Sequence, residues 1–134
     1  MSQENLEVVR KSCEAWLRGD FDAMSEINHP EVEWDTTNFE GWMERKVYRG
    51  REEVMRFLEE WLASWDSYEA GVDKLVDAGE WVVVFWWQRM TGRGSGVPVA
   101  LDSAQVWTVR EGRVLRIDNY TDRGKALEAV GISE

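Results

Sequence analysis

Residues 81–120 read WVVVFWWQRMTGRGSGVPVALDSAQVWTVREGRVLRIDNY, and this stretch decides the fold. It is rich in the β-branched and aromatic residues that favour strands. Glycine-containing turns at residues 92–96 and 111–112 interrupt it. The expected strands cover residues 81–91, 97–109 and 113–120. Because connections this short join antiparallel neighbours, the stretch predicts a meander of three long strands.

The sequence on either side of this meander carries helical patterns and two more strands. Apolar residues recur every three or four positions, most clearly from Val54 to Trp65. The expected helices lie at residues 2–19, 20–27, 50–65 and 122–130. The other expected strands are residues 68–76 and a brief one at 32–36. Residues 37–49 show no periodicity and are expected to form a loop over a pocket.

This order of elements indicates an α+β fold. Helices come first and a strand meander follows, which is typical of helices packed on one face of a curved antiparallel sheet. A length of 134 residues suits one domain, so residues 1–134 are expected to form a single unit.

Composition excludes several classes of partner. The 26 acidic and 16 basic residues give a formal net charge of -10, which would repel nucleic acid. Cys13 is the single cysteine and there is one histidine, so we expect no disulfide and no metal site. No apolar run has the length of a membrane span, and the start MSQENLEVVRK lacks a secretion signal. We therefore expect a cytoplasmic protein that contacts neither nucleic acid nor membrane.

Five phrases of the chain carry a family resemblance. They are LEVVRKSCEAWLRGDFDAM at 6–24, HPEVEW at 29–34, VYRGREEVMRFLEEWLASW at 47–65, VDAGEWVVV at 76–84 and VWTVREGRVLRIDNYTDRGKALEAVG at 106–131. Together they resemble the SnoaL-like branch of the nuclear transport factor 2-like superfamily. The resemblance implies a cone-shaped curved antiparallel sheet with three helices on its concave face, a deep apolar pocket and a short C-terminal helix. It also implies a homodimer. This fold serves cofactor-free isomerases, cyclases and hydrolases as well as binding modules, so it does not by itself decide the function.

Gln105 and Asn119 occupy the positions that matter most for activity. Strand alternation and the hairpin at 111–112 bring the two side chains to one level of one face. The resemblance implies a histidine and an aspartate at these positions in the SnoaL-like cyclases, where they transfer protons. A carboxamide does not exchange protons near neutral pH, so the cyclase mechanism loses its base here.

The ketosteroid isomerases offer a second comparison. Their general-base aspartate matches Trp34, and their tyrosine on the first helix matches Ser12. Asp35 is the neighbouring carboxylate, but a shift of one residue along a strand turns a side chain to the opposite face. Three residues remain as alternative acids or bases, namely Asp35, Asp118 and Tyr48.

An apolar pocket needs aromatic walls with few polar groups. The residues expected to line it are Trp16, Trp34, Phe57, Trp61, Trp107 and Ile117. Arg89 either turns inward, where it would hold a ligand carboxylate or pair with Asp118, or lies on the surface. Gln105 and Asn119 either read a ligand carbonyl or hydroxyl, or satisfy each other in the core.

Three functions follow from these expectations. The sequence slightly favours a cofactor-free isomerase, cyclase or hydrolase that acts on a small hydrophobic, ring-bearing molecule. The alternatives are a binding module without catalysis, and a dimeric accessory protein whose pocket is filled by its own tryptophans. Trp81, Trp86 and Trp87 occupy both faces of one strand, so we expect a tryptophan on the convex face at a dimer interface.

Overall fold

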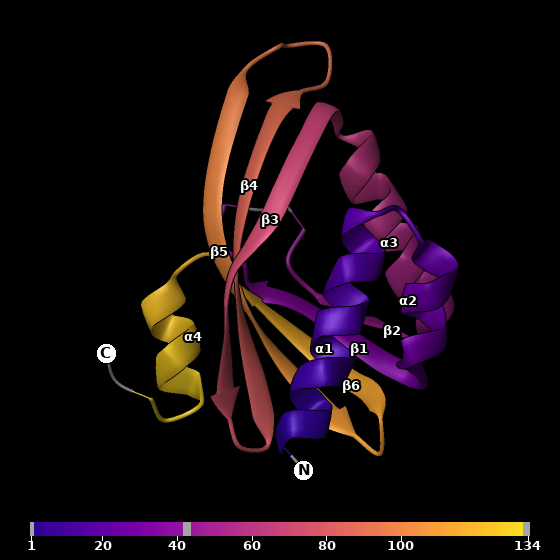
Figure 1. Cartoon of the computed structure of the whole chain (residues 1–134). Helices are drawn as coiled ribbons and strands as arrows, with labels where there is room; N and C mark the ends of the chain where they lie inside the picture. Colours follow the sequence, from indigo (N-terminus) through magenta and orange to yellow (C-terminus); the bar gives the residue numbers. More distant parts are fainter. Residues whose placement is uncertain (1, 42–43, 133–134) are drawn as a thin grey trace.

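Four helices and six strands follow one another within residues 2–41 and 44–132, the part of the chain that the computed structural model describes (Figure 1). The helices are α1 (Ser2–Leu17), α2 (Phe21–Ile27), α3 (Arg51–Ala63) and α4 (Arg123–Ala129). The strands are β1 (Asn28–Asn38), β2 (Val47–Arg49), β3 (Trp65–Ala78), β4 (Trp81–Gly92), β5 (Pro98–Arg110) and β6 (Arg113–Tyr120). The predicted α+β class and order of elements are confirmed. Two details differ, because β1 is longer than expected and β2 lies within the expected loop.

Short polar side chains cap the start of two of the helices, α2 and α4. Asp20 Oδ1 accepts a 3.1 Å hydrogen bond from the backbone nitrogen of Ala23, at the start of α2. Asp122 Oδ1 accepts one of 3.2 Å from the backbone nitrogen of Lys125, at the start of α4. These bonds occupy backbone donors that have no partner within the helix.

The six strands form one curved sheet in the order β2-β1-β6-β5-β4-β3. All neighbouring pairs are antiparallel except β1 and β6, which run parallel. The expectation of an antiparallel sheet is corrected at this pair. Hairpins impose antiparallel pairing, whereas β1 and β6 are far apart in sequence and meet only when the sheet assembles.

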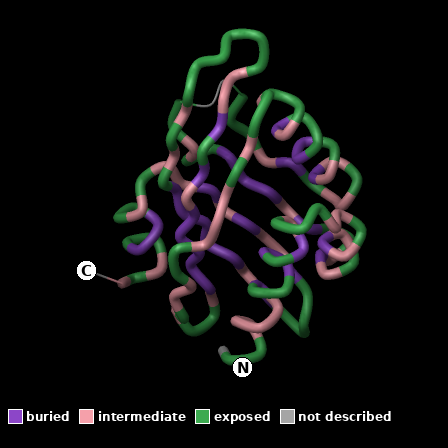
Figure 2. The backbone as a smooth tube through the Cα atoms, turned by 45° about the horizontal axis from the view of Figure 1, so that its top comes forward, coloured by how far each residue is buried: buried purple, intermediate pink, exposed green. Residues whose placement is uncertain are grey.

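The helices cover both faces of the sheet. Helices α1, α2 and α3 lie against one face, and α4 lies against the other (Figure 1). Buried residues concentrate along the strands between them, whereas the turn between β4 and β5 is exposed (Figure 2). The larger hydrophobic core therefore lies under α1 to α3, and a smaller one lies under α4.

The long hairpin of β3 and β4 has a bulge that contributes to the bend of the sheet. The pairing register shifts between Val72 and Lys74 of β3. Beside the bulge, the indole of Trp87 lies over Gly71, where a Cβ atom would be 2.5 Å from Trp87 Nε1. Glycine at position 71 is thus required by the close approach of a neighbouring side chain.

Candidate functional site

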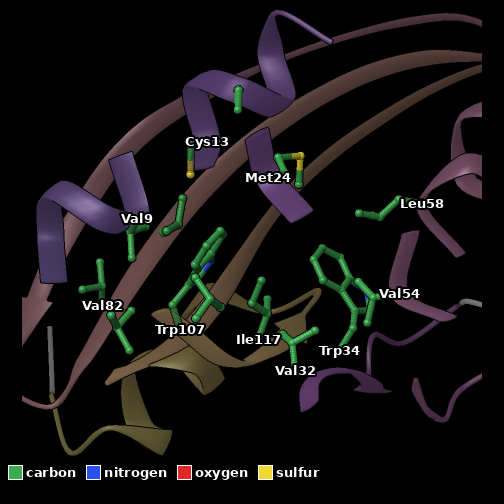
Figure 3. Packing of buried hydrophobic residues seen from close by; sticks show 14 of the residues in the cluster. Val9, Cys13, Met24, Val32, Trp34, Val54, Leu58, Val82, Trp107 and Ile117 are labelled. Atoms are coloured by element: carbon green, nitrogen blue, oxygen red, sulfur yellow. The ribbon is translucent and has the colours of Figure 1, made fainter. Parts of the chain in front are cut away.

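A cavity lies between helices α1 to α3 and the sheet. Its volume is about 70 Å³ and it is partly open to solvent. Trp34 and Trp107 reach into the core from the sheet, and Cys13 and Met24 approach it from the helices (Figure 3). The aromatic residues that line the cavity are Trp16, Trp34, Phe39, Phe57, Trp61, Tyr68, Trp86 and Trp107. The other lining residues are Ser12, Cys13, Met24, Thr36, Leu58, Gln88, Ser103, Gln105 and Asn119.

Gln105 and Asn119 pair directly across the β5–β6 hairpin. Gln105 Nε2 donates a 2.9 Å hydrogen bond to Asn119 Oδ1. Asn119 Nδ2 in turn donates one of 3.0 Å to the backbone oxygen of Asp35 on β1. The two amides therefore link three neighbouring strands, and both are buried at 9% and 5% exposure.

The side-chain oxygen of Gln105 is fully engaged. It accepts hydrogen bonds of 2.8 Å from Trp86 Nε1 and of 2.8 Å from Trp107 Nε1. A carbonyl oxygen has two lone pairs, so no acceptor capacity is left for a ligand. The carboxamide of Gln105 therefore holds two indoles of the cavity wall in place.

A second polar network crosses the cavity wall closer to β3. Tyr68 Oη donates a 2.8 Å hydrogen bond to Gln88 Oε1 and accepts one of 3.2 Å from Trp16 Nε1. Gln88 Nε2 lies 3.5 Å from Ser103 Oγ. Tyr68, Gln88 and Ser103 were not among the residues expected at the site, although strand alternation places Gln88 on the face of Trp86.

The titratable groups on the cavity wall are Cys13 and Tyr68 among the described residues. Burial raises the pKa of the Cys13 thiol to about 12, with a smaller contribution from the charge of Glu14. Burial also raises the pKa of Tyr68, while hydrogen bonds from Trp16 and Trp61 oppose the shift. Both groups therefore keep their protons at neutral pH. The described wall has no carboxylate, imidazole, ammonium or guanidinium group.

The alternative carboxylates lie outside this wall. Arg116 donates hydrogen bonds to the carboxylates of Asp35 and Glu33, and its Nε donates one of 2.9 Å to Asp118 Oδ1. Asp35 also accepts bonds from the backbone nitrogen and the hydroxyl of Thr37, at 2.7 and 2.6 Å. The expectation that Asp35 or Asp118 acts as an acid or base inside the cavity is therefore corrected. Alternation along β1 and β6 turns both to the face opposite Trp34 and Asn119.

Tyr48 is likewise absent from the cavity wall. Its ring packs on Phe57 with centroids 4.5 Å apart, and its hydroxyl donates a 3.0 Å hydrogen bond to Glu44 Oε1. Burial raises the pKa of Tyr48 to about 12, and the bond to Glu44 adds to the shift. The phenol is thus a neutral donor to a carboxylate beside the cavity.

Arg89, for which an inward and a surface position were both open, and Ile117, which was expected in the wall, lie outside the cavity lining. Arg89 is exposed, lies over the ring of Trp87 and has its Nη1 3.3 Å from Asp102 Oδ1. The register of β4 turns Arg89 away from the face that carries Gln88, so the surface alternative holds and the inward one is corrected. Ile117 is buried and pairs with Trp107 and Trp34 on neighbouring strands, but it is not one of the residues that line the cavity. The five expected aromatic residues do line the cavity.

Two wall residues have polar atoms without a partner. Ser12 Oγ and Trp34 Nε1 are buried, and neither forms a hydrogen bond within the described part of the chain. Ser12 is 1% exposed and Trp34 is 8% exposed. A hydroxyl within the apolar stripe of α1, next to Cys13, is the sequence signal that marks Ser12.

Two kinds of feature are absent from the described residues. Residues 2–41 and 44–132 contain no group of three or more His, Cys, Asp or Glu side chains placed to hold a metal ion. None of the helices in this part of the chain is long and apolar enough to cross a membrane.

Comparisons with known proteins identify relatives of this structure. A family model described as SnoaL-like domain matches residues 9–117. None of the curated proteins matches the chain. An NTF2-like protein from Burkholderia thailandensis E264 is 28% identical, with a TM-score of 0.78 over 94% of this chain and 96% of that chain.

Two further solved structures share the fold at lower identity. An NTF2-like protein of unknown function from Burkholderia pseudomallei K96243 is 22% identical, with a TM-score of 0.77 over 96% of this chain and 98% of that chain. TerC, co-crystallized with polyporic acid, is 21% identical, with a TM-score of 0.73 over 96% of this chain and 99% of that chain.

Proposed function

This chain belongs to the SnoaL-like domain family, and we propose that it binds a small, mostly apolar molecule without acid–base catalysis. The binding site is the cavity between α1, α2, α3 and the sheet. This proposal of binding without catalysis differs from the expectation from the sequence, which slightly favoured an enzyme. The reason is the set of hydrogen bonds around the two amides.

The proposal rests mainly on the hydrogen bonds that the Gln105 side chain makes within the protein. Its oxygen accepts bonds from Trp86 and Trp107, and its nitrogen donates to Asn119. An enzyme of the isomerase or cyclase kind needs a base that exchanges protons near neutral pH within reach of the substrate. The described wall has no such group, and Asp35 and Asp118 are held by Arg116 on the other face.

The shape and lining of the cavity support a small apolar ligand. Aromatic side chains from α1, α3, β1, β3, β4 and β5 provide most of the wall. A volume of about 70 Å³ is well below the roughly 300–1,000 Å³ of pockets for drug-sized ligands. We therefore propose a ligand of about one small ring, part of which extends into the open side of the cavity. That TerC was co-crystallized with polyporic acid supports ligand binding by this fold.

The proposal extends to a homodimer formed through the outer face of the sheet. Trp87 is half-buried there and lies under the guanidinium of Arg89. Arginine and tryptophan on an exposed sheet face are typical of interfaces. A cytoplasmic location stays a prediction of the sequence.

Cyclopentanone tests both parts of the proposal, because it is small, apolar and carries α-hydrogens that a general base removes. We expect calorimetry to show saturable binding to the wild-type protein. We expect proton NMR in D₂O at neutral pH to show no acceleration of α-hydrogen exchange by the protein. The matched control is Cys13→Leu, which fills the cavity and should abolish binding.

The outcomes separate the alternatives. Accelerated exchange that Cys13→Leu abolishes would show a proton-transfer enzyme and overturn the proposal. Absence of saturable binding to the wild type would favour an accessory protein whose cavity is only a packing remnant.

A further inference from the structure

A chain of hydrogen bonds runs along the cavity wall from α1 through β3 and β4 to β5, and its first donors fix its direction. Trp16 Nε1 donates to Tyr68 Oη, and Trp61 donates to the same oxygen. An indole N–H only donates, so the two indoles occupy both lone pairs of the phenol oxygen. Tyr68 must therefore donate its own proton, which it does to Gln88 Oε1 at 2.8 Å.

The bond from Tyr68 fixes the orientation of the Gln88 amide. Its oxygen faces Tyr68, so its nitrogen faces the other way and lies 3.5 Å from Ser103 Oγ. Ser103 pairs with Trp86 of β4, and Gln88 follows Trp86 by two residues on the same face. Both side chains line the cavity and are buried, at 8% exposure for Gln88 and 3% for Ser103. The chain of bonds thus ends in the cavity wall.

This end of the chain has unused donors. The Ser103 hydroxyl donates to no group within the described part of the protein, and Gln88 Nε2 carries a second N–H. Their mutual contact of 3.5 Å is long for a hydrogen bond. The network around Gln105 differs, because it ends on an acceptor, the backbone oxygen of Asp35. Buried polar groups are nearly always hydrogen-bonded, so the end at Gln88 and Ser103 calls for an acceptor.

We propose that Gln88 Nε2 and Ser103 Oγ together donate to one acceptor oxygen of the ligand. This inference rests on the proposed function and names the ligand class, a small, neutral, mostly apolar molecule with one oxygen of the ketone type. Two donor atoms 3.5 Å apart can both lie at about 2.9 Å from a single oxygen, so their spacing suits one acceptor. The ligand is neutral because the described wall has no charged side chain to pair with it.

The assignment places specificity at positions that the family resemblance does not single out. Gln105 and Asn119, where the related cyclases are expected to have their acid and base, hold the wall of the cavity together. Gln88 and Ser103 instead select the ligand by its oxygen, from the side of the cavity formed by β4 and β5. The apolar body of the ligand then lies against the aromatic side chains of α1, α3 and β1.

A matched pair of probes measures this specificity. Cyclopentanone and methylenecyclopentane have nearly the same shape, but only the ketone accepts a strong hydrogen bond. We expect the wild-type protein to bind the ketone about fivefold or more tightly, the ratio expected from one net hydrogen bond. Competition for one site, followed by tryptophan fluorescence, gives the ratio of the two dissociation constants.

Matched variants assign the ratio to residues. Ser103→Ala removes a proposed donor, and we expect it to lower the ratio about twofold or more. Ser12→Ala removes a hydroxyl from α1 in the same wall and should leave the ratio unchanged. Gln88→Met keeps the length of the side chain without its amide and should also lower the ratio. If Gln88→Met fails to fold, the two serine variants still decide the question.

The carbonyl stretch of the bound ketone reports the contact directly. A hydrogen bond to the oxygen weakens the C=O bond and lowers its stretching frequency. In infrared difference spectra with cyclopentanone that is isotope-labelled at its carbonyl, we expect the bound band at a lower frequency than in hexane. Ser103→Ala should raise this frequency, and Ser12→Ala should not. A merely structural role of Ser103 would weaken the binding of both probes and leave the band in place.

The failures of the two proposals give different results. If the wild type binds both probes equally well, Gln88 and Ser103 bind only water, and this inference is overturned while the proposed function stands. It is also overturned if Ser103→Ala leaves either the ratio or the band unchanged, or if Ser12→Ala has an equal effect. If neither probe binds, the proposed function fails, and this inference fails with it.

Discussion

Gln105 donates a 2.9 Å hydrogen bond from Nε2 to Oδ1 of Asn119, its direct partner on the neighbouring strand. The bond continues through Asn119 to the backbone oxygen of Asp35, so it connects β5, β6 and β1. It lies where the related cyclases are expected to have their acid and base. In this chain, those two positions stabilise the inner face of the sheet with neutral groups.

Replacement of Gln105 by leucine should destabilise the protein strongly. The change leaves the indole N–H groups of Trp86 and Trp107 and the oxygen of Asn119 without their partner. Each buried unsatisfied group costs about 1–3 kcal/mol, so we expect a loss of about 3 kcal/mol or more in urea unfolding. In the control Gln88→Leu, Tyr68 loses its acceptor and the cost should be smaller. Equal losses of unfolding free energy for both variants would contradict the role of Gln105 in holding the two indoles.

Asn119→Asp should introduce a titrating group whose pKa lies above the reference value of about 3.9. Burial disfavours the charged form, and one carboxyl oxygen would face the backbone oxygen of Asp35. A raised folded-state pKa adds stability that is present below the unfolded-state pKa and is lost as the pH rises through the folded-state value. Relative to wild type, the variant should therefore lose stability from pH 4 to 8 in denaturant melts. A constant difference would mean that residue 119 contacts water.

The carboxyl group of Asp118 should also make stability depend on pH. Burial raises the pKa of Asp118, the charge and hydrogen bond of Arg116 oppose the shift, and Asp35 adds to it. The associated stability is complete below about pH 3.9 and is lost as the pH rises through the folded-state pKa. Asp118→Asn should thus gain stability relative to wild type as the pH rises above 4, by about 1.4 kcal/mol for each unit of pKa shift. Parallel pH profiles of the two proteins would show that burial does not dominate at this site.

The homodimer is tested by light scattering at high micromolar concentration. We expect twice the mass of one chain for the wild type, and the mass of one chain for Trp87→Lys, which places a second cation beside Arg89 on the outer face. The control Ser95→Lys, in the exposed turn between β4 and β5, should stay dimeric. A wild type with the mass of one chain at this concentration would remove the dimer from the proposal.

Much of the fold follows from local patterns in the sequence. Alternation and turn residues correctly predicted β4, β5 and β6, and the hairpin at Glu111-Gly112 correctly predicted that Gln105 and Asn119 lie at one level. These features depend on residues close together in the chain, where periodicity and turn chemistry determine the geometry. The aromatic lining also follows, because helical and strand spacing assigns a face to each tryptophan.

Only the tertiary structure decided what the polar groups do. Arg116 contacts Asp35 across 81 positions of sequence because β1 and β6 meet in parallel, and no local pattern predicts that pairing. Trp86 and Trp107 converge on one oxygen of Gln105, which turns an expected ligand contact into a wall support. Hydrogen bonds depend on tenths of an ångström, whereas sequence periodicity specifies only a face. The sequence therefore determined which residues surround the cavity, and packing determined that Ser12 and Trp34 are left without partners there.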